Sequence, residues 1–148
     1  MRLTAFTDYG LRALMRLAAD SERLFTTDEI SREFNISRNH LSKVVHELAA
    51  AGLVATQKGA RGGIRLARPA ADITLGEIVR LLESGQPLVE CFRADGGQCV
   101  LTRGCRFRTR LRAAQDAFLR ELDRSTLAEC VWRPEAPPAR RSNTERSR

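Results

Sequence analysis

Four cysteines stand out among the 148 residues as the side chains best suited to bind metal. Cys91, Cys99 and Cys105 lie in one stretch, with seven residues between the first two and five between the last two. Structural zinc sites usually contain cysteine pairs separated by about two to four residues, and this stretch contains no such pair. Three widely spaced thiolates instead suit an iron–sulfur cluster, whose irons lie apart and each need a ligand.

Two other interpretations of these cysteines stay open. Three loop thiols without a partner would be inert, and an intramolecular disulfide is less expected because we expect a cytoplasmic protein, where thiols stay reduced. That expectation rests on the lack of an apolar stretch of about 18 residues, which a membrane span needs. The first residues, MRLTAFTDYG, also lack a signal-peptide core. The fourth cysteine, Cys130, lies near Trp132, which favours packing or a stray thiol over ligation.

The three thiols lie in a segment, 84–105, that is predicted to be a loop because it contains several glycines and a proline. A long amphipathic helix is predicted after it, from 106 to about 124. Its apolar stripe consists of Phe107, Leu111, Ala114, Phe118 and Leu122. A stripe of this length in a small chain is typical of packing against a second copy. We therefore expect a homodimer and assign 106–130 to dimerisation.

The first half of the chain has the pattern of a helix-turn-helix. A first helix is predicted from a cap at Thr7 to about Asp20. A second runs from Thr26, which has capping-box spacing to Glu29, to about 34. A third begins at Ser37 and ends near 51, where Gly52 suits the position after a helix.

The third predicted helix separates its residues onto two faces. Leu41, Val44, Val45 and Leu48 recur at helical spacing on one face. Polar side chains suited to contact DNA crowd its start and opposite face: Ser37, Arg38, Asn39, His40, Ser42 and Lys43. A recognition helix has this arrangement, in which arginine pairs with guanine and asparagine with adenine. An ordinary amphipathic surface helix has the same pattern, so the segment after this helix must distinguish the two interpretations.

Two short strands, 53–56 and 64–67, are predicted directly after this helix. The turn between them holds three glycines together with Lys58 and Arg61. A basic, glycine-rich hairpin after a helix-turn-helix indicates a winged helix, whose wing could place Arg61 in a narrow minor groove. A connecting helix, 75–82, is predicted from the capping-box pair Thr74 and Glu77. The predicted fold is therefore mainly α with a small β wing, and 1–83 form the DNA-binding domain.

The net charge agrees with a polyanionic partner. The chain carries a formal charge of +7 and has an isoelectric point near 10.2, values typical of nucleic-acid binding. In 131–148 five arginines against two glutamates contribute +3, which leaves +4 for the remainder. Rich in proline, arginine and serine, this segment is predicted to be a disordered basic tail that is either solvated or touches phosphate.

Together these motifs resemble a family of bacterial winged-helix regulators that includes IscR and RirA, and they are most similar to its nitric-oxide-sensing members. The resemblance extends to about Cys130 and is carried by MRLTAFTDYGLRAL, ISRNHLSKVVHEL, KGARGGIRLARP and LVECF…C…C…F…LDRSTLAE. It implies a repressor that binds double-stranded promoter DNA and senses nitric oxide through an iron–sulfur cluster. Nitric oxide would release the operators and derepress detoxification genes.

The resemblance also implies a ligand set. Each subunit would hold one cluster, [4Fe-4S] or alternatively [2Fe-2S], on Cys91, Cys99 and Cys105, with Asp8 of the partner subunit as a further ligand. Asp8 has a simpler explanation as well, since an acid in the first turn of a helix complements its dipole. IscR-like proteins instead use a histidine just after the third cysteine. Here that position holds Arg106, Phe107 and Arg108, and the two histidines, His40 and His46, lie on the predicted recognition helix.

Two functions other than a nitric-oxide-sensing repressor are considered for the same cysteines. The spacing of the first two cysteines recurs in RirA-like iron sensors, so an iron- or cluster-responsive repressor of the same family is the alternative. An enzyme or electron carrier that uses the same cysteines finds no support, because the sequence lacks a nucleotide-binding loop, a further ligand motif and a paired acid–base constellation.

Overall fold

The computed structural model describes residues 2–134 of the chain. The described part is mostly helical with one two-stranded antiparallel sheet, which confirms the predicted fold class. Its helices and strands are α1 (Ala5–Ala18), α2 (Thr27–Glu33), α3 (Arg38–Ala50), β1 (Val54–Gln57), β2 (Gly63–Leu66), α4 (Leu75–Leu82) and α5 (Arg106–Leu122). Three short 3-10 turns complete the set: η1 (Ala70–Asp72), η2 (Glu90–Phe92) and η3 (Leu127–Cys130).

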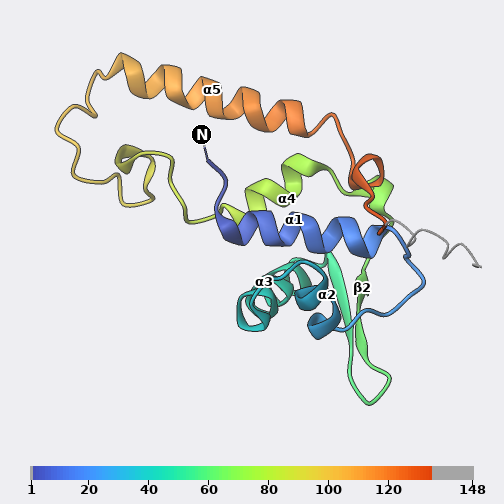
Figure 1. Cartoon of the computed structure of the whole chain (residues 1–148). Helices are drawn as coiled ribbons and strands as arrows, with labels where there is room; N and C mark the ends of the chain where they lie inside the picture. The colour runs from blue at the N-terminus through green and yellow to red at the C-terminus, as the bar shows by residue number, and fades with distance from the viewer. Residues whose placement is uncertain (1, 135–148) are drawn as a thin grey trace, which may run out of the picture.

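Helix α1 occupies the middle of the molecule (Figure 1). It contacts α3, β2 and η3 as well as α4, and α4 in turn contacts α5. In Figure 1 the hairpin, α2 and α3 lie on one side of α1, whereas α4 and α5 lie on the other. Helix α1 therefore connects the helix-turn-helix and the hairpin with α4, and through α4 with the long helix α5.

The N-terminal cap of α1 differs from the prediction. Thr4, in an extended conformation, caps the helix, and its hydroxyl accepts the N–H of Thr7 at 3.2 Å. The predicted cap at Thr7 is wrong, because Thr7 already lies inside the first turn and is fully buried. Both residues have the side chain that a cap needs, and the three-residue offset follows from tertiary contacts of Thr7 described below.

The helix-turn-helix follows the predicted pattern closely. Thr26 caps α2 by accepting the N–H of Glu29 at 3.1 Å. Asn35 makes the turn with φ of 52°, a left-handed conformation that asparagine tolerates better than most residues. Ser37 stands at the cap position of α3, although its side chain forms no capping hydrogen bond within the described residues. Gly52 ends α3 in the left-handed conformation expected there, with φ of 74°.

The wing is an antiparallel hairpin that pairs Val54 with Leu66 and Gln57 with Gly63. Each strand is displaced by one residue from its predicted bounds. A third segment anchors the hairpin, since Phe25 and Ile64 exchange backbone hydrogen bonds of 2.9 and 2.7 Å. A Cβ on Gly63 would lie 2.7 Å from the Phe25 carbonyl oxygen, so this close approach requires glycine.

One apolar core joins α1, the helix-turn-helix, the hairpin and α4. The four residues predicted for the inner face of α3 are all buried, which confirms that assignment. The largest fully buried side chains include Leu14, Phe25, Leu41, Leu48 and Ile78. Leu127 of η3 is also fully buried in this core, so a segment far along the chain stabilises the DNA-binding unit.

The end of α5 differs from the prediction that treated 106–130 as one dimerisation segment. The helix ends at Leu122, and the chain turns back so that η3 packs on α1 and η1. Leu127 donates its N–H to the Ile73 carbonyl at 2.8 Å. This tertiary contact, absent from the local pattern, ends the helix early.

The start of the predicted tail is ordered by contacts with the DNA-binding unit. Trp132 donates its N–H to the Met15 carbonyl at 3.3 Å, and its ring lies 5.1 Å from that of Phe34. The prediction of disorder is therefore wrong for 131–134, and 135–148 lie outside the described residues. No helix in the described part of the chain is long and apolar enough to cross a bilayer.

Candidate nucleic-acid interface and cysteine loop

Helix α3 presents its polar residues to solvent. The side chains predicted to contact DNA on this helix are all exposed, whereas the apolar face lies against α1 and α2. The exposed set is Ser37, Arg38, Asn39, His40, Ser42 and Lys43. The geometry of a recognition helix, with a packed back and a free polar front, is therefore in place. Contact of these residues with DNA stays a prediction.

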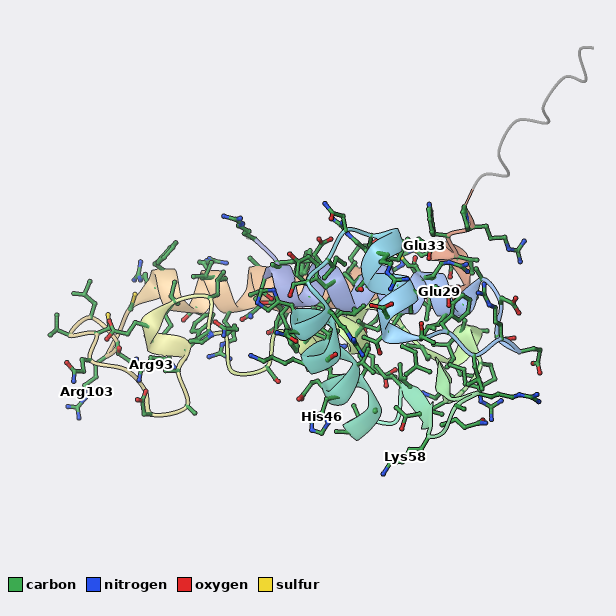
Figure 2. The ribbon with its side chains drawn as sticks, turned by 60° about the horizontal axis from the view of Figure 1, so that its bottom comes forward. Glu29, Glu33, His46, Lys58, Arg93 and Arg103 are labelled. Carbon is green, nitrogen blue, oxygen red and sulfur yellow. The ribbon has the colours of Figure 1, made fainter. Side chains whose placement is uncertain are left out.

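The tip of the wing carries the two predicted basic residues in exposed positions, Lys58 and Arg61. A tight turn brings them there, because a Cβ on Gly62 would lie 2.3 Å from the Gln57 carbonyl oxygen. In Figure 2 Lys58 projects from the wing and His46 from α3 on the same side of the molecule. Arg93 and Arg103 of the cysteine loop lie toward the opposite end. The candidate DNA-binding surface and the cysteine loop are thus separate regions.

The segment 84–105 is a loop with one short turn, η2, at Cys91. All four cysteines are free thiols, and each is partly buried: Cys91, Cys99, Cys105 and Cys130. Within residues 2–134 of this single chain, no three histidine, cysteine or acidic side chains come together as a metal site. The thiols fit an iron–sulfur cluster by their chemistry, because thiolates are the ligands that hold such clusters. To hold one cluster with all three thiols, the loop would have to close further than it does in this structure.

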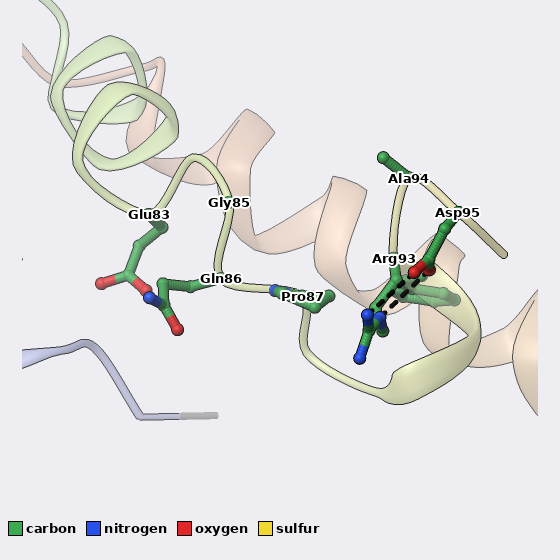
Figure 3. Close-up of a pocket in the computed structure, with 8 residues that line it drawn as sticks. Glu83, Gly85, Gln86, Pro87, Arg93, Ala94 and Asp95 are labelled. Carbon is green, nitrogen blue, oxygen red and sulfur yellow. Dashed lines mark hydrogen bonds and ion pairs between the residues drawn. The ribbon is translucent and has the colours of Figure 1, made fainter. Parts of the chain in front are cut away.

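Side-chain hydrogen bonds give the first arm of this loop its shape. Glu90 accepts the N–H of Gln98 at 3.1 Å, across the interval from Cys91 to Cys99. Asp95 accepts from the Arg93 guanidinium at 2.8 Å and from the Gly97 N–H at 3.0 Å. Both hydrogen bonds hold the pKa of the Asp95 carboxyl below its usual range, and the one from Arg93 has the larger effect. Figure 3 shows this ion pair among the residues that line a hollow. The hollow has a volume of about 620 Å³, and Glu83 also lines it.

The third cysteine begins the long helix. Cys105 is the N-cap of α5, and its Sγ accepts the N–H of Arg108 at 3.4 Å. The Nε of the Arg108 side chain is buried and has no hydrogen-bond partner within the described residues. A buried donor without a partner, on a residue whose main chain contacts a thiol, suits a group that brings acceptor atoms, as the sulfurs of a cluster would.

Asp8 lies in the first turn of α1, where its charge complements the helix dipole as expected. Its carboxylate pairs with Arg12, with 2.7 Å between Nη2 and Oδ2. Both side chains are almost half exposed, so the Asp8 carboxylate is accessible to a second molecule. Its role as an iron ligand stays a prediction.

Glu83, which the sequence did not single out, connects the root of the cysteine loop to α1. It ends α4 directly before the loop, and its Oε1 accepts the N–H of Thr4 at 2.8 Å and the Thr4 hydroxyl at 3.0 Å. The Thr7 hydroxyl donates to the same oxygen. These contacts bury Thr7 and fix the start of α1 against the loop. No local pattern could have predicted them, because 79 positions separate Thr4 from Glu83.

The same two turns of α1 also contact the recognition helix. The ring of Tyr9 stacks on that of His40 with 6.5 Å between centroids. A Cβ on Gly10 would lie 2.3 Å from Cδ1 of Leu82 and 3.3 Å from Cγ1 of Val44. Helices α1, α3 and α4 therefore meet at Gly10, where a larger side chain would push them apart. His40, predicted to face DNA, is exposed but also forms part of this junction.

The chain is similar to known proteins over nearly its whole length. Residues 3–132 match the family model Rrf2, described as an iron-dependent transcriptional regulator. The chain belongs to the Rrf2 family. It is 48% identical over 132 residues to the HTH-type transcriptional regulator NsrR of Geobacillus kaustophilus, covering 88% of this chain and 90% of that one. The NsrR of Halalkalibacterium halodurans is 42% identical over the same share of this chain and 90% of its own.

Solved structures of Rrf2-like regulators have the same architecture. The oxidized form of Staphylococcus aureus CymR superposes with a TM-score of 0.70 at 25% identity, covering 92% of this chain and all of that one. CymR of B. subtilis, a global cysteine regulator, gives a TM-score of 0.69 at 29% identity, over 87% of this chain and 97% of its own. IscR of T. potens gives a TM-score of 0.67 at 26% identity, over 87% of this chain and 85% of its own.

These relatives are transcription regulators and not enzymes. Their identity over nearly the whole chain confirms the predicted family and the predicted function as a DNA-binding repressor. The family description also supports dependence on iron. The identities of the individual DNA-binding and iron-binding residues stay predictions.

Proposed function

We propose that this Rrf2-family repressor senses nitric oxide through an iron–sulfur cluster and releases its operators when that cluster is destroyed. The similarity to NsrR regulators, 41–48% identity in three relatives, supports this choice within the family. The observation that carries the proposal is structural. Three free thiols lie on a loop whose root is bonded, through Glu83, to the helix that packs on the recognition helix.

Cys91, Cys99 and Cys105 would hold the cluster, preferably [4Fe-4S] and alternatively [2Fe-2S], one per subunit. Asp8 of the partner subunit would supply a further oxygen ligand. When bound, the cluster supplies iron that reacts with nitric oxide, most readily where an exchangeable carboxylate rather than a thiolate is the ligand. The chain's own contribution is to hold the thiols and to connect them to α1.

A homodimer accounts for apolar surface near the loop. Val100, Leu101 and Phe107 are 94%, 67% and 68% exposed, and large apolar side chains that cluster on a surface favour an interface. They lie at the tip of the loop and at the start of α5, the helix whose stripe predicts dimerisation. A second copy of the chain could cover these three side chains. Its Asp8 would come near the thiols only if the α1 helices of the two copies also approach each other.

Within the dimer, Asp8 would bind from one subunit while the thiols bind from the other. This arrangement fixes the angle between the two recognition helices, because Asp8 lies on α1 and α1 packs on α3. On release of the cluster, the Asp8 carboxylate would keep only its ion pair with Arg12, and loop 84–105 would no longer be tied to the partner subunit. The hydrogen bonds of Glu83 with Thr4 and Thr7 would pass a movement of the loop to α1.

A modest energetic coupling is sufficient for this switch. About 1–3 kcal/mol between two sites changes the affinity of one of them by roughly 5- to 150-fold. Dimeric helix-turn-helix proteins meet two half-sites about 34–36 Å apart. A change in the angle between the two recognition helices therefore weakens binding at both half-sites together. Because its target is promoter DNA, we expect the protein in the bacterial cytoplasm.

Parallel titrations separate this function from the iron-responsive alternative. Anaerobically purified protein bound to a fluorescent promoter fragment would be titrated with nitric oxide and, in a second cuvette, with an iron chelator. We expect release on adding nitric oxide in amounts comparable to the cluster, while chelator at matched concentrations acts slowly or not at all. Rapid release by chelator with none by nitric oxide would favour the iron sensor. A colourless protein that binds DNA equally well would contradict both.

A further inference from the structure

The Nε of Arg108 is the one polar side-chain atom in the described residues that is buried and left without a hydrogen-bond partner. Buried donors are normally paired, since removing a donor from water without a replacement partner is unfavourable. Arginine keeps its charge under all physiological conditions, so this donor cannot be neutralised by losing a proton. Its environment in the complete protein should therefore supply an acceptor.

The neighbourhood of Arg108 indicates which acceptor fits. A hollow of about 260 Å³ is lined by Arg108, Cys105, Thr102 and Thr109, among others. The Arg108 N–H already donates to Sγ of Cys105 across the first turn of α5. Arg108 thus contacts a proposed iron ligand through its main chain and lines the hollow that this ligand also lines.

The other arginines nearby do not share this position. Arg106 and Arg110 are exposed, and the guanidinium of Arg112 lies 4.0 Å from the centre of the Phe92 ring. Arg110 follows Arg108 by two positions on the same helix and carries the same charge, so it offers a matched comparison. What distinguishes Arg108 is its buried donor rather than its charge.

We propose that Arg108 donates its Nε–H to a sulfur at the Cys105 end of the cluster and so tunes the cluster's potential and lifetime. This inference rests on the proposed function, because it needs a cluster on Cys105. Arg108 is a positioning residue here and not an iron ligand. Hydrogen bonds to sulfur and nearby positive charge stabilise the more reduced, more negative state of a cluster. The donor should therefore raise the reduction potential and slow cluster loss.

Three variants of the full-length chain test this inference. Arg108→Met keeps most of the apolar stem but removes the donor and the charge, whereas Arg108→Lys keeps the charge without the Nε. Arg110→Met removes the same charge from an exposed position. Each anaerobic protein would be analysed for iron and sulfide, titrated with dithionite in the presence of mediators, and exposed to a chelator while its visible absorption is followed.

We expect Arg108→Met to shift the midpoint potential to a more negative value and to lose its cluster several-fold faster. Arg108→Lys should recover only part of the shift, and Arg110→Met should behave as wild type. Equal shifts for Arg108→Met and Arg110→Met, or no shift in either, would overturn the inference while leaving the cluster in place. A wild-type chain without iron and sulfide would overturn the proposed function, and the inference with it.

Discussion

At the residue scale, the wing offers the sharpest test of the DNA-binding surface. Arg61→Ala should weaken operator binding by about 1–3 kcal/mol, because an arginine that enters a groove contacts bases or the narrow groove itself. Fluorescence anisotropy with a promoter fragment measures the loss, and the visible spectrum should stay unchanged. Arg120→Ala, which removes the same charge from an exposed position on α5, is the control. Loss of both DNA binding and cluster in Arg61→Ala would indicate misfolding instead.

Asp8 can be tested without disturbing the start of α1. Asp8→Asn keeps the shape and removes the anionic ligand, so the protein should retain a cluster whose reaction with nitric oxide has a different rate. Asp28→Asn is a matched control. Asp28 also lies in the first turn of a helix, and it forms an ion pair with Arg32, four residues further along the chain. Stopped-flow absorption measures the rates. If Asp8→Asn reacts as wild type does, Asp8 is not a ligand.

Residue type and spacing were enough to propose the three thiols and the polar face of α3, whereas Asp8 was proposed as a ligand only from the family resemblance. It did not predict Glu83 or Arg108. A glutamate at a helix end and one arginine among several carry no local signal. Their importance comes from burial and from partners far along the chain, as for Glu83 with Thr4. Which of two threonines caps α1 was decided in the same way.

At the scale of elements, α1 is the connection between loop and recognition helix. Glu83→Ala removes the acceptor of three hydrogen bonds from Thr4 and Thr7. We expect this variant to bind a normal amount of cluster. The ratio of its operator affinities before and after addition of nitric oxide should, however, fall toward one. Glu77→Ala, on the same helix and paired at the surface with Arg68, should keep the ratio. An unchanged ratio in Glu83→Ala would remove this contact from the signalling route.

The junction of α4 and α5 gives a prediction about pH. Arg80 donates to Asp123 at 2.7 Å, and this hydrogen bond holds the pKa of the Asp123 carboxyl below its usual range. The ionised carboxylate therefore stabilises the folded chain above the unfolded pKa of about 3.9, and this contribution is lost as pH falls through the lower folded pKa. Asp123→Asn should melt below wild type at pH ~7, and the difference should shrink at roughly pH 3 and below. A difference that grows in acid would contradict the assignment.

Elements were predicted best where local signals agree. Helix α4 has its predicted bounds, because Thr74 caps it by accepting the N–H of Glu77 at 3.1 Å. The strands moved by one residue, since pairing with each other and with Phe25 sets their register. Helix α5 ends at Leu122, close to the predicted end at about 124. The path of the chain after it could not be predicted, because it turns back to bury Leu127 in the core formed by elements far away in the sequence.

At the scale of the whole molecule, α1 lies between two regions with different tasks (Figure 1). One side holds α3 and the wing, which we propose to contact DNA, and the other carries the thiols and the long helix. A switch is possible because the first two turns of α1 contact both, through Glu83 and Leu82 on one side and through His40 and Val44 on the other. In a homodimer this connection would occur twice.

In the proposed switch, the cluster decides whether the protein holds DNA. The most direct measurement follows the cluster's absorption and the anisotropy of a labelled operator in the same anaerobic cuvette during stepwise addition of nitric oxide. We expect both signals to fall together and to reach their end points at the same number of equivalents of nitric oxide. An absorption spectrum that bleaches completely while the operator stays bound would contradict it.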